Sequence, residues 1–458
     1  MIKYKYMSSI NPLDGRYSNK IKELSCVMDE ASLSTNRMLV EIKYLQALSN
    51  LKIKDFKLNL KEKKILENIL PLSKKDLQDI LDIEKTTNHD VKAIEYFIAK
   101  KLKNTSLKNR LNFIHFALTS EDINSVSYAL MLRDGLEKAI LPSLKNILKT
   151  LDAMAKKYAN ITMLARTHGQ PAVPTTFGKE IRVFHYRLKK QIAQLEAQKI
   201  SAKFSGAVGS FNAHCFAYPE INWQNFSKKF IAEFNKQRKI KIYLNEISTQ
   251  IDPHDSFAET FHTINRVNNI LIDFSQDMWR YISDDWLSQK TVKGEIGSST
   301  MPQKINPIDF ENAEGNLGLA NAMFGFFANK LMVSRLQRDL SDSTVQRNIA
   351  SSLGYSLVAY KALLKGLNKI EINKKKINEY LNSHPEVLAE GIQTILRQAG
   401  VKNPYELLKG LTRGKTLTYA DLDNFIEKLD VSASIKTKLR NISFKNYSGI
   451  SEQLARKK

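Results

Sequence analysis

Apolar residues return every three or four positions over long stretches of this chain, and that spacing limits what the chain can fold into. It holds over residues 177–195 and again over residues 257–282, long enough in each case for a helix of several turns. Asp252 and Pro253 precede the second stretch, and such a pair is typical of an N-cap followed by a first-turn proline. The pattern predicts an all-α fold around a bundle of long helices.

A third long helical pattern begins at Thr119. Thr119 and Asp122 have the spacing of a capping box, and apolar residues follow at helical intervals. Pro142 falls within this pattern, so we expect the helix to bend there. No comparable stretch alternates apolar and polar residues, so we expect strands only as short pieces, near residues 161–165 and 203–208.

Shorter amphipathic patterns flank the long helices on both sides. Polar connectors join those before residue 112, and the dipeptides His384-Pro385 and Asn403-Pro404 interrupt those after residue 365. The sequence therefore predicts three helical domains, namely residues 1–112, a central long-helix bundle over residues 113–364, and residues 365–458.

The charge of the chain raises the question of a nucleic-acid partner. Its 458 residues include 70 Lys and Arg against 47 Asp and Glu, a formal net charge of +23, which attracts anions. The basic residues are scattered, however, and no zinc-finger or RNA-recognition pattern accompanies them. We therefore expect no nucleic-acid partner.

Cysteine content and hydropathy indicate the compartment. Cys26 and Cys215 are too few for a disulfide framework and lack the spacing of metal ligands. The N-terminus lacks an apolar stretch with a cleavage site, and no run reaches the ~18 apolar residues of a membrane span. We expect a cytoplasmic protein that does not interact with a membrane.

Residues 294–316 form the stretch that packing alone explains least. Its glycines, with the hydroxyls of Ser298 and Ser299, make the first half conformationally free, while Pro302 and Pro307 stiffen the second half. A connection of this length between helices is uncommon unless it is functional. The stretch can close over a ligand, and an ordinary helix connection is the alternative.

Within this stretch, GSSTMPQKINP resembles the signature loop of the fumarase, aspartase and argininosuccinate lyase superfamily, whose members eliminate fumarate from succinyl-bearing substrates. The resemblance implies that Ser298 is the base that removes a proton beside a carboxylate, with Ser299 as the alternative. A serine hydroxyl is a weak base until nearby cations lower its pKa, and Lys304 is the nearest candidate. Many relatives have His before this lysine, where this chain has Gln303, so we expect no proton transfer at position 303.

Residues 166–171 interrupt the helical pattern with polar side chains, and Pro171 and Pro174 favour an ordered loop that leaves His168 accessible. A lone histidine of this kind is ordinarily a surface or structural residue. The segment resembles the second conserved loop of the superfamily, which implies that His168 is the general acid that protonates the leaving nitrogen. An imidazole suits this role because its pKa lies near the working pH.

A basic cluster follows the signature stretch and contains Arg335, Arg338, Ser343 and Arg347. Arginine binds phosphate or carboxylate through two parallel hydrogen bonds, and a serine hydroxyl can add a donor. The cluster therefore suits an anionic group of the substrate, and an exposed, charged helix face is the alternative.

Two shorter segments complete the set. Arg16-Tyr17 follows an Asp-Gly turn, and Asn88-His89-Asp90 precedes a helical pattern, where threonine and asparagine can cap the helix and free N–H groups can bind an anion. With the basic cluster, these segments resemble the branch of the superfamily that acts on succinylated purine nucleotides. The resemblance implies that Arg338, Ser343 and Arg347 hold the substrate's phosphate.

The resemblance runs from Asp14 to Arg347 and more loosely to Lys415. It implies the elimination of fumarate from adenylosuccinate and from SAICAR, without a metal or an organic cofactor. It also implies a homotetramer in which loops of three chains build each active site. Another superfamily lyase with a different succinyl substrate is the nearest alternative, and a silent helical scaffold or a basic nucleic-acid binder is the alternative from another class.

The same resemblance assigns a role to each site residue. Lys304 and Asn306 would stabilise the carbanion, and Glu311 would orient a catalytic partner. The residues expected to be catalytic are His168, Ser298, His89, Lys304 and Glu311. The residues expected to bind substrate are Arg16, Tyr17, Asn88, His89, Asp90, Thr119, Ser120, Gln250, Ser299, Met301, Lys304, Asn306, Arg338, Ser343 and Arg347.

Overall fold

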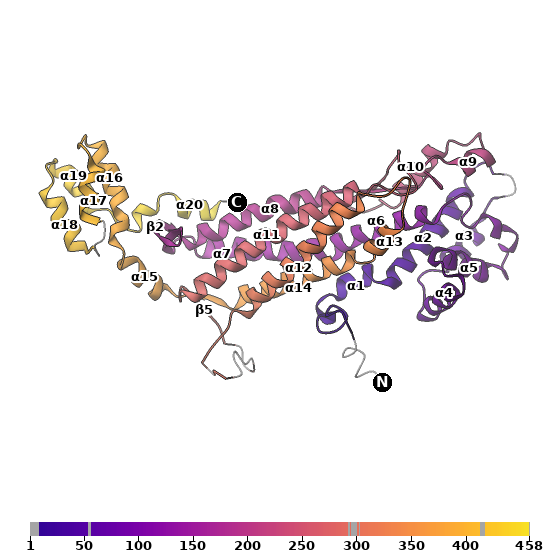
Figure 1. Cartoon of the computed structure of the whole chain (residues 1–458), viewed down its shortest axis with the longest axis horizontal. Coiled ribbons are helices and arrows are strands. Elements are labelled where there is room, and N and C mark those ends of the chain that lie inside the picture. The colour runs from indigo at the N-terminus through magenta and orange to yellow at the C-terminus, as the bar shows by residue number, and fades with distance from the viewer. Residues whose placement is uncertain are drawn as a thin grey trace. The chain divides into compact units, whose positions relative to one another are not determined.

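The computed structural model describes residues 9–53, 56–291, 294, 300–301, 303–412 and 417–457. Helices make up most of these residues, which confirms the all-α class (Figure 1). The α-helices are α1 (Lys22–Met28), α2 (Glu30–Leu48), α3 (Leu60–Glu67), α4 (Lys74–Thr87), α5 (Asp90–Leu102), α6 (Ser120–Gly135), α7 (Leu141–Lys157), α8 (Phe177–Glu196), α9 (Asn212–Ala217), α10 (Trp223–Glu233), α11 (Asp255–Ser283), α12 (Ile308–Leu331), α13 (Ser341–Gln346), α14 (Ile349–Lys369), α15 (Lys374–Asn382), α16 (Ala389–Gln398), α17 (Pro404–Thr412), α18 (Tyr419–Lys428), α19 (Ala433–Arg440) and α20 (Ser451–Arg456).

The strands in the described part of the chain form three two-stranded sheets. Strands β1 (Thr162–Thr167) and β2 (Gln170–Thr176) are antiparallel, with Thr162 opposite Thr176. Strands β3 (Lys199–Ala202) and β4 (Lys241–Leu244) are parallel, and β5 (Leu287–Gln289) and β6 (Ile370–Ile372) are antiparallel. Strands are therefore limited to short pieces, as the sequence predicts.

The chain forms two compact units. Unit 1 comprises Met1–Lys145, Lys190–Asn269 and Gly315–Lys361, and unit 2 comprises Asn146–Lys189, Ile270–Glu314 and Ala362–Lys458. The long helices α7, α8, α11, α12 and α14 contribute residues to both units. The division into three domains at residues 112 and 364 stays a prediction. A core within residues 389–442, formed by α16 to α19, includes Ile392, Leu396, Leu408, Leu422, Ile426 and Leu439.

A buried polar layer fixes the register of α11, α12 and α14, which Figure 1 shows as neighbouring long helices. Asn268 is fully buried, and its amide donates to Asn321 Oδ1 at 3.0 Å and to Ser356 Oγ at 3.1 Å. Tyr360 OH donates to Asn268 Oδ1 at 2.6 Å. Because a shift of any one helix would leave these buried groups unpaired, the layer specifies the alignment of all three.

The capping box predicted at Thr119 is confirmed, since Thr119 is the N-cap of α6. Thr119 N donates to Asp122 Oδ2 at 2.8 Å, which is the reciprocal half of the capping box. A π-helical turn over Leu136–Ile140 separates α6 from α7, directly before Pro142. The bend expected at Pro142 stays a prediction, and the structure shows a wider helical turn just before this residue, which lacks an N–H donor.

The strand expected over residues 203–208 is wrong, because β3 ends at Ala202. The backbone N–H groups that follow bond to side chains of α6 instead of to a neighbouring strand. Lys203 N donates to Ser125 Oγ at 2.8 Å, and Ser205 N donates to Asp122 Oδ1 at 2.8 Å. The strand expected near residues 161–165 is confirmed as β1.

The N-cap expected at Asp252 is also wrong, because α11 begins at Asp255. Asp252 is 1% exposed, and its carboxylate accepts hydrogen bonds from Ser201 Oγ at 2.8 Å and from Asn245 Nδ2 at 3.0 Å. It also accepts from His254 N at 3.0 Å. This carboxylate joins three segments in the interior, so it is not available to cap the helix.

None of the helices in the described residue ranges has the length and apolar character that a membrane span requires.

Candidate active site

The segment Asn88-His89-Asp90 connects two helices of unit 1. Asn88 has left-handed backbone (φ 50°) and ends α4, and His89 is the N-cap of α5. His89 Nδ1 accepts a hydrogen bond from Lys92 N at 3.2 Å. The expectation that threonine or asparagine caps this helix is therefore wrong, because Thr87 and Asn88 belong to the end of α4.

This cap orients the histidine toward the start of α6. Because Nδ1 accepts, the proton of the neutral ring lies on Nε2, which is 3.4 Å from Ser120 Oγ. The His89 side chain is 49% exposed, so the ring is also open to a ligand. His89 and Ser120, two predicted substrate-binding residues, are thus neighbours.

Asp90 joins two arginines. Its Oδ2 lies 2.6 Å from Arg37 Nη2 and 2.9 Å from Arg347 Nη2, and the Arg37 side chain is only 5% exposed. Burial opposes ionisation of Asp90, but Arg37, the N–H of Val91 and Arg347 together outweigh it and hold the pKa below its usual value. Asp90 therefore stays a carboxylate and fixes the position of Arg347, whose side chain remains 37% exposed.

Arg338 lies between α12 and α13 in unit 1, and its side chain is 16% exposed. Its Nη1 donates to Gln250 Oε1 at 3.2 Å, so two more predicted substrate-binding residues are brought together. Its Nη2 lies 3.1 Å from Glu121 Oε2 and 3.6 Å from Asp342 Oδ1. Arg338 Nε is buried and has no hydrogen-bond partner among the described residues.

The remaining predicted residues of unit 1 differ in how closely they approach Arg338 and its partners. Ser343 belongs to α13, and its N–H donates to Asp342 Oδ1 at 2.7 Å, beside Arg338. Arg16 is exposed, and Tyr17 is half-buried. Their turn packs on α14, where Leu13 lies against Gly354. The predicted residues linked by hydrogen bonds, ion pairs or adjacent positions in the chain are His89, Asp90, Thr119, Ser120, Gln250, Arg338, Ser343 and Arg347.

His168 belongs to unit 2 and occupies the tip of the β1–β2 hairpin. His168 and Gly169 both have positive φ, 54° and 75°, as a two-residue hairpin turn of this kind requires. Left-handed backbone costs a residue with a Cβ roughly 1–2 kcal/mol, so a histidine at this position points to a need for its side chain. The side chain is exposed, as the sequence predicts, although the loop is a hairpin.

Arg166 holds the hairpin in place. Its Nη1 donates to Asp284 Oδ2 at 2.6 Å, and its guanidinium lies 4.9 Å from the Trp286 ring centre and 4.8 Å from the Tyr380 ring centre. An arginine that stacks on two aromatic rings and forms an ion pair loses most of its freedom. Arg166 therefore sets the direction in which His168 extends.

Ser298 and Ser299 lie outside the described residues. Met301 and Lys304 are exposed, and Asn306 is half-buried just before α12. Glu311, in the first turn of α12, accepts a hydrogen bond from Trp279 Nε1 at 3.1 Å. The predicted site residues are thus divided between unit 1 and unit 2.

Three residues with clear structural roles at the site have no predicted role. Glu121 pairs with Arg338, Arg37 pairs with Asp90, and Lys203 pairs with Asp122 at 2.6 Å with both side chains fully buried. The only signal in the sequence is the paired carboxylates of Thr119-Ser120-Glu121-Asp122, since the cap needs one of them. Arg37 and Lys203 are indistinguishable in sequence from the many scattered basic residues.

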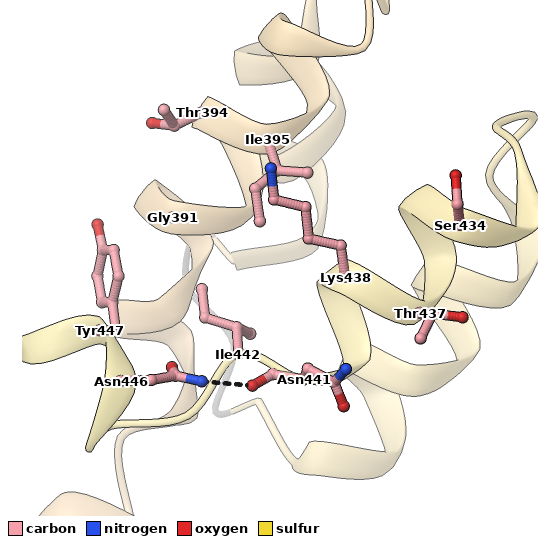
Figure 2. Close-up of a pocket in the computed structure, with 10 residues that line it drawn as sticks. All are labelled: Gly391, Thr394, Ile395, Ser434, Thr437, Lys438, Asn441, Ile442, Asn446 and Tyr447. Carbon is pink, nitrogen blue, oxygen red and sulfur yellow. Dashed lines mark hydrogen bonds between the residues drawn. The ribbon is translucent and has the colours of Figure 1, made fainter.

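A cavity of about 760 Å³ lies between α16 and α19 in unit 2 (Figure 2). Thr394, Thr437 and Lys438 contribute polar groups to its lining, and Gly391 and Tyr447 contribute surface beside them. None of the predicted site residues lines it. We therefore assign it no part in the chemistry of the site.

No group of three or more His, Cys, Asp and Glu side chains in the described ranges is arranged to hold a metal ion.

The comparison with known proteins decides the family. The protein family described as "Lyase" matches residues 15–323, and the family described as "Adenylosuccinate lyase C-terminal" matches residues 334–448. The adenylosuccinate lyase of Legionella pneumophila (strain Corby) is 45% identical over 454 residues, covering 98% of this chain and 98% of its own length. That of Escherichia coli (strain K12) is 44% identical over 447 residues, covering 97% of each chain.

The chain belongs to the adenylosuccinate lyase family. Solved structures agree at the level of the fold: a fumarate lyase from Mesorhizobium sp. BNC1 superposes with a TM-score of 0.74 at 15% identity, over 95% of this chain and 96% of that one. The 3-carboxy-cis,cis-muconate lactonizing enzyme from Pseudomonas putida has the same TM-score at 17% identity, over 95% of each chain. The family match and the 44–45% identical relatives confirm the superfamily resemblance.

Replacement of Asp90 tests the arginine pair at the site. In Asp90→Asn the neutral amide no longer balances the buried Arg37, and we expect the free energy of unfolding, measured with urea, to fall by about 1–3 kcal/mol. In the wild type, the ionised Asp90 contributes to the free energy of unfolding. This contribution is complete above the pKa of an unfolded aspartate, about 3.9, and is lost as pH falls through the lower pKa of Asp90 in the folded protein. Asp82→Asn is the control, because Asp82 pairs with Lys85 in solvent. Equal stability of wild type and Asp90→Asn at pH 7 would contradict the role given to Asp90.

Proposed function

We propose that this protein cleaves adenylosuccinate to AMP and fumarate, and SAICAR to AICAR and fumarate. Identity of 45% over 98% of the chain to a curated adenylosuccinate lyase is the observation that carries the proposal. The grouping of His89, Ser120, Gln250, Arg338 and Arg347 in unit 1 supports it, because these side chains offer donors for an anionic, nucleotide-sized ligand.

The reaction is an elimination with general base and general acid. Ser298 is the base that removes the proton from the Cβ of the succinyl group, and the electron pair is delocalised into the adjacent carboxylate. Lys304 and Asn306 supply a cation and an amide donor to the doubly charged carboxylate that results. The electron pair then forms the double bond of fumarate as the C–N bond breaks, and His168 protonates the departing nitrogen.

The phosphate of the substrate binds to Arg338, Ser343 and Arg347 in this proposal. Arg347 is suitably placed, because Asp90 holds it while more than a third of its side chain is exposed. His89 positions the phosphate or supports His168, and the exposed edge of its ring is consistent with either task. The proposed phosphate contacts distinguish this substrate class from succinyl compounds that lack a phosphate.

The other predicted residues complete the contacts with the substrate. Thr119, Ser120 and Gln250 hold the succinyl carboxylates or the base, and Glu311 orients a catalytic partner. Arg16, Tyr17, Asn88, Asp90, Ser299 and Met301 line the substrate. We place the reaction in the cytoplasm, which suits two cysteines that are both free and exposed, Cys26 and Cys215.

We also propose a homotetramer whose active sites take loops from three chains. The support comes from one face of α12, where Leu319 is 47% and Phe326 is 54% exposed. Gly315, Gly318 and Gly325 share this face at helical spacing, and a Cβ added to any of them would meet no atom within 4 Å. A helix with core residues on one side and small or apolar residues on the other is typical of a helix covered on both sides. A second copy of the chain is the proposed cover.

An absorbance assay with purified protein tests the reaction. We expect adenylosuccinate and SAICAR to be cleaved and argininosuccinate, which has no phosphate, to be left intact. In Ser298→Ala turnover should be lost while substrate still binds, because the hydroxyl acts mainly in the transition state. Ser299→Ala is the matched control on the adjacent hydroxyl. Activity in Ser298→Ala with an inactive Ser299→Ala would move the base to Ser299, and no cleavage of either nucleotide by wild type would refute the function.

Gly318→Gln tests the assembly. Glutamine is a better helix former than glycine by up to about 1 kcal/mol, and its side chain has open space in the isolated chain, so the fold should persist. Its length should prevent a second helix from approaching, so light scattering should show a tetramer for wild type and smaller species for the variant. Gly410→Gln is the control, since Gly410 is equally open but lies in α17. A wild-type monomer, or a tetrameric Gly318→Gln, would contradict the proposed interface.

A further inference from the structure

Arg338 lies against two buried carboxyl groups, those of Glu121 and Asp342. Its Nη2 lies 3.1 Å from Glu121 and 3.6 Å from Asp342, and these two carboxyl groups are 2% and 3% exposed. Lys203, the other cation that influences Glu121, is already bound to Asp122 Oδ1 at 2.6 Å and to the carbonyl of Gly206. The two buried carboxyl groups therefore share a single arginine, whose own side chain is 16% exposed.

The unpaired atoms of this cluster mark it as incomplete. Glu121 Oε1, Asp342 Oδ2 and Arg338 Nε are all buried without a hydrogen-bond partner among the described residues. Buried polar atoms of a settled structure are almost always paired, and an unpaired charged group is costly. An unpaired oxygen on a buried carboxyl group is also the atom that can carry a proton without losing an existing bond.

Among Glu121, Asp342 and Arg338, it is Glu121 whose affinity for a proton is clearly raised. It faces Arg338 and Asp342 from the α13 side and Lys203 from the segment after β3, and Tyr128 lies further along α6. Burial is the largest influence, and Asp342 acts in the same direction, while Arg338 and Lys203 oppose both. The result raises the pKa of Glu121 to about 8.

We propose that Glu121 takes up a proton when the phosphate of a nucleotide binds Arg338, so that Glu121 makes phosphate binding depend on pH. The proposal rests on the phosphate-binding role given above to Arg338. A phosphate dianion beside Arg338 adds two negative charges next to two buried carboxyl groups, and protonation of one of them relieves the repulsion. At a pH where Glu121 of the free protein is ionised, the proton comes from solvent and returns to solvent when the nucleotide leaves. Because substrate and product carry the same phosphate, Glu121 stays protonated throughout turnover and acts as a positioning residue.

AMP binding to the wild-type protein tests the proposal without a variant. The phosphate of AMP is a dianion above pH 7, because its second pKa is about 6, so its own titration does not interfere between pH 7.5 and 9. Calorimetry at pH 8.5 in two buffers of different ionisation enthalpy should show uptake of protons on binding. The Kd of AMP should rise by about threefold or more between pH 7.5 and 9. Uptake of a single proton on binding can raise the Kd by at most about tenfold per pH unit. Binding without proton uptake would overturn the proposal.

The variant Glu121→Gln identifies the group that takes up the proton. Glutamine has the shape of the protonated acid, so AMP should bind at pH 9 as tightly as at pH 7.5, with no proton uptake. Glu41→Gln is the matched control, because Glu41 is also fully buried with an unpaired Oε2 but pairs with His115 instead of an arginine. The control should keep the wild-type pH dependence. Proton uptake that survives in a folded Glu121→Gln would assign it to another group and overturn the proposal.

A third arm separates this proposal from the proposed function. In Arg338→Ala the affinity for AMP should fall strongly while the affinity for adenosine stays near that of wild type. If Arg338→Ala leaves AMP binding unchanged, the phosphate role of Arg338 fails, and the proposal for Glu121 fails with it. If Arg338→Ala weakens AMP binding but the wild-type protein takes up no proton, the phosphate role stands and only the proposal for Glu121 fails.

Discussion

The fully buried ion pair between Asp122 and Lys203 fixes the end of α6 on which the unit 1 part of the site is built. Burial of two charges is costly, and here the Asp122 carboxylate offsets that cost by accepting from the N–H groups of Thr119, Ser205 and Gly206 as well as from Lys203. Burial also lowers the pKa of Lys203 against the opposing influence of Asp122. The pair thereby ties the first turn of α6 to the segment that follows β3.

The other charged contacts of unit 1 extend from this fixed point. Ser120 and Glu121 follow the cap directly, so the position of the cap sets where Ser120 meets His89 and where Glu121 meets Arg338. Asp90 acts in the same way for Arg347 from the start of α5. The arginines proposed to bind phosphate are therefore held in position before any ligand arrives, which reduces the entropy lost on binding. The same carboxyl groups compete with the ligand for those arginines, and this competition is the origin of the proposed pH dependence.

The sequence predicts those features that depend on neighbours along the chain. Periodicity is sufficient for α8, α11 and the all-α class, and the spacing of Thr119 and Asp122 is sufficient for the start of α6. Prediction from the sequence fails where a side chain or an N–H group binds a residue that is distant in the chain. Asp252 has the sequence context of an N-cap, but its carboxylate binds Ser201 and Asn245 instead. The residues after Ala202 have the sequence pattern of a strand, but side chains of α6 bind their N–H groups. The role of Glu121 cannot be read from its sequence neighbours for the same reason, since its partner Arg338 is more than two hundred residues away.

Recognition of the candidate site shows the same division. The signature loop and the loop around His168 are recognisable because their residues are contiguous, and the family comparison agrees with them. The pairing of Arg347 with Asp90 and of Arg338 with Gln250 depends on how separate helices pack, which a pattern of residues does not contain. The contacts in the structure thus show what the sequence does not: the groups that hold these arginines in position are also the groups with which a bound phosphate would compete.

A crystal structure of the protein with AMP bound tests the central claim most directly. We expect the phosphate oxygens to lie within hydrogen-bonding distance of the guanidinium groups of Arg338 and Arg347, with Ser343 as an additional donor. A phosphate bound elsewhere, with Arg338 still paired to Glu121, Asp342 and Gln250 and Arg347 still paired to Asp90, would contradict the account.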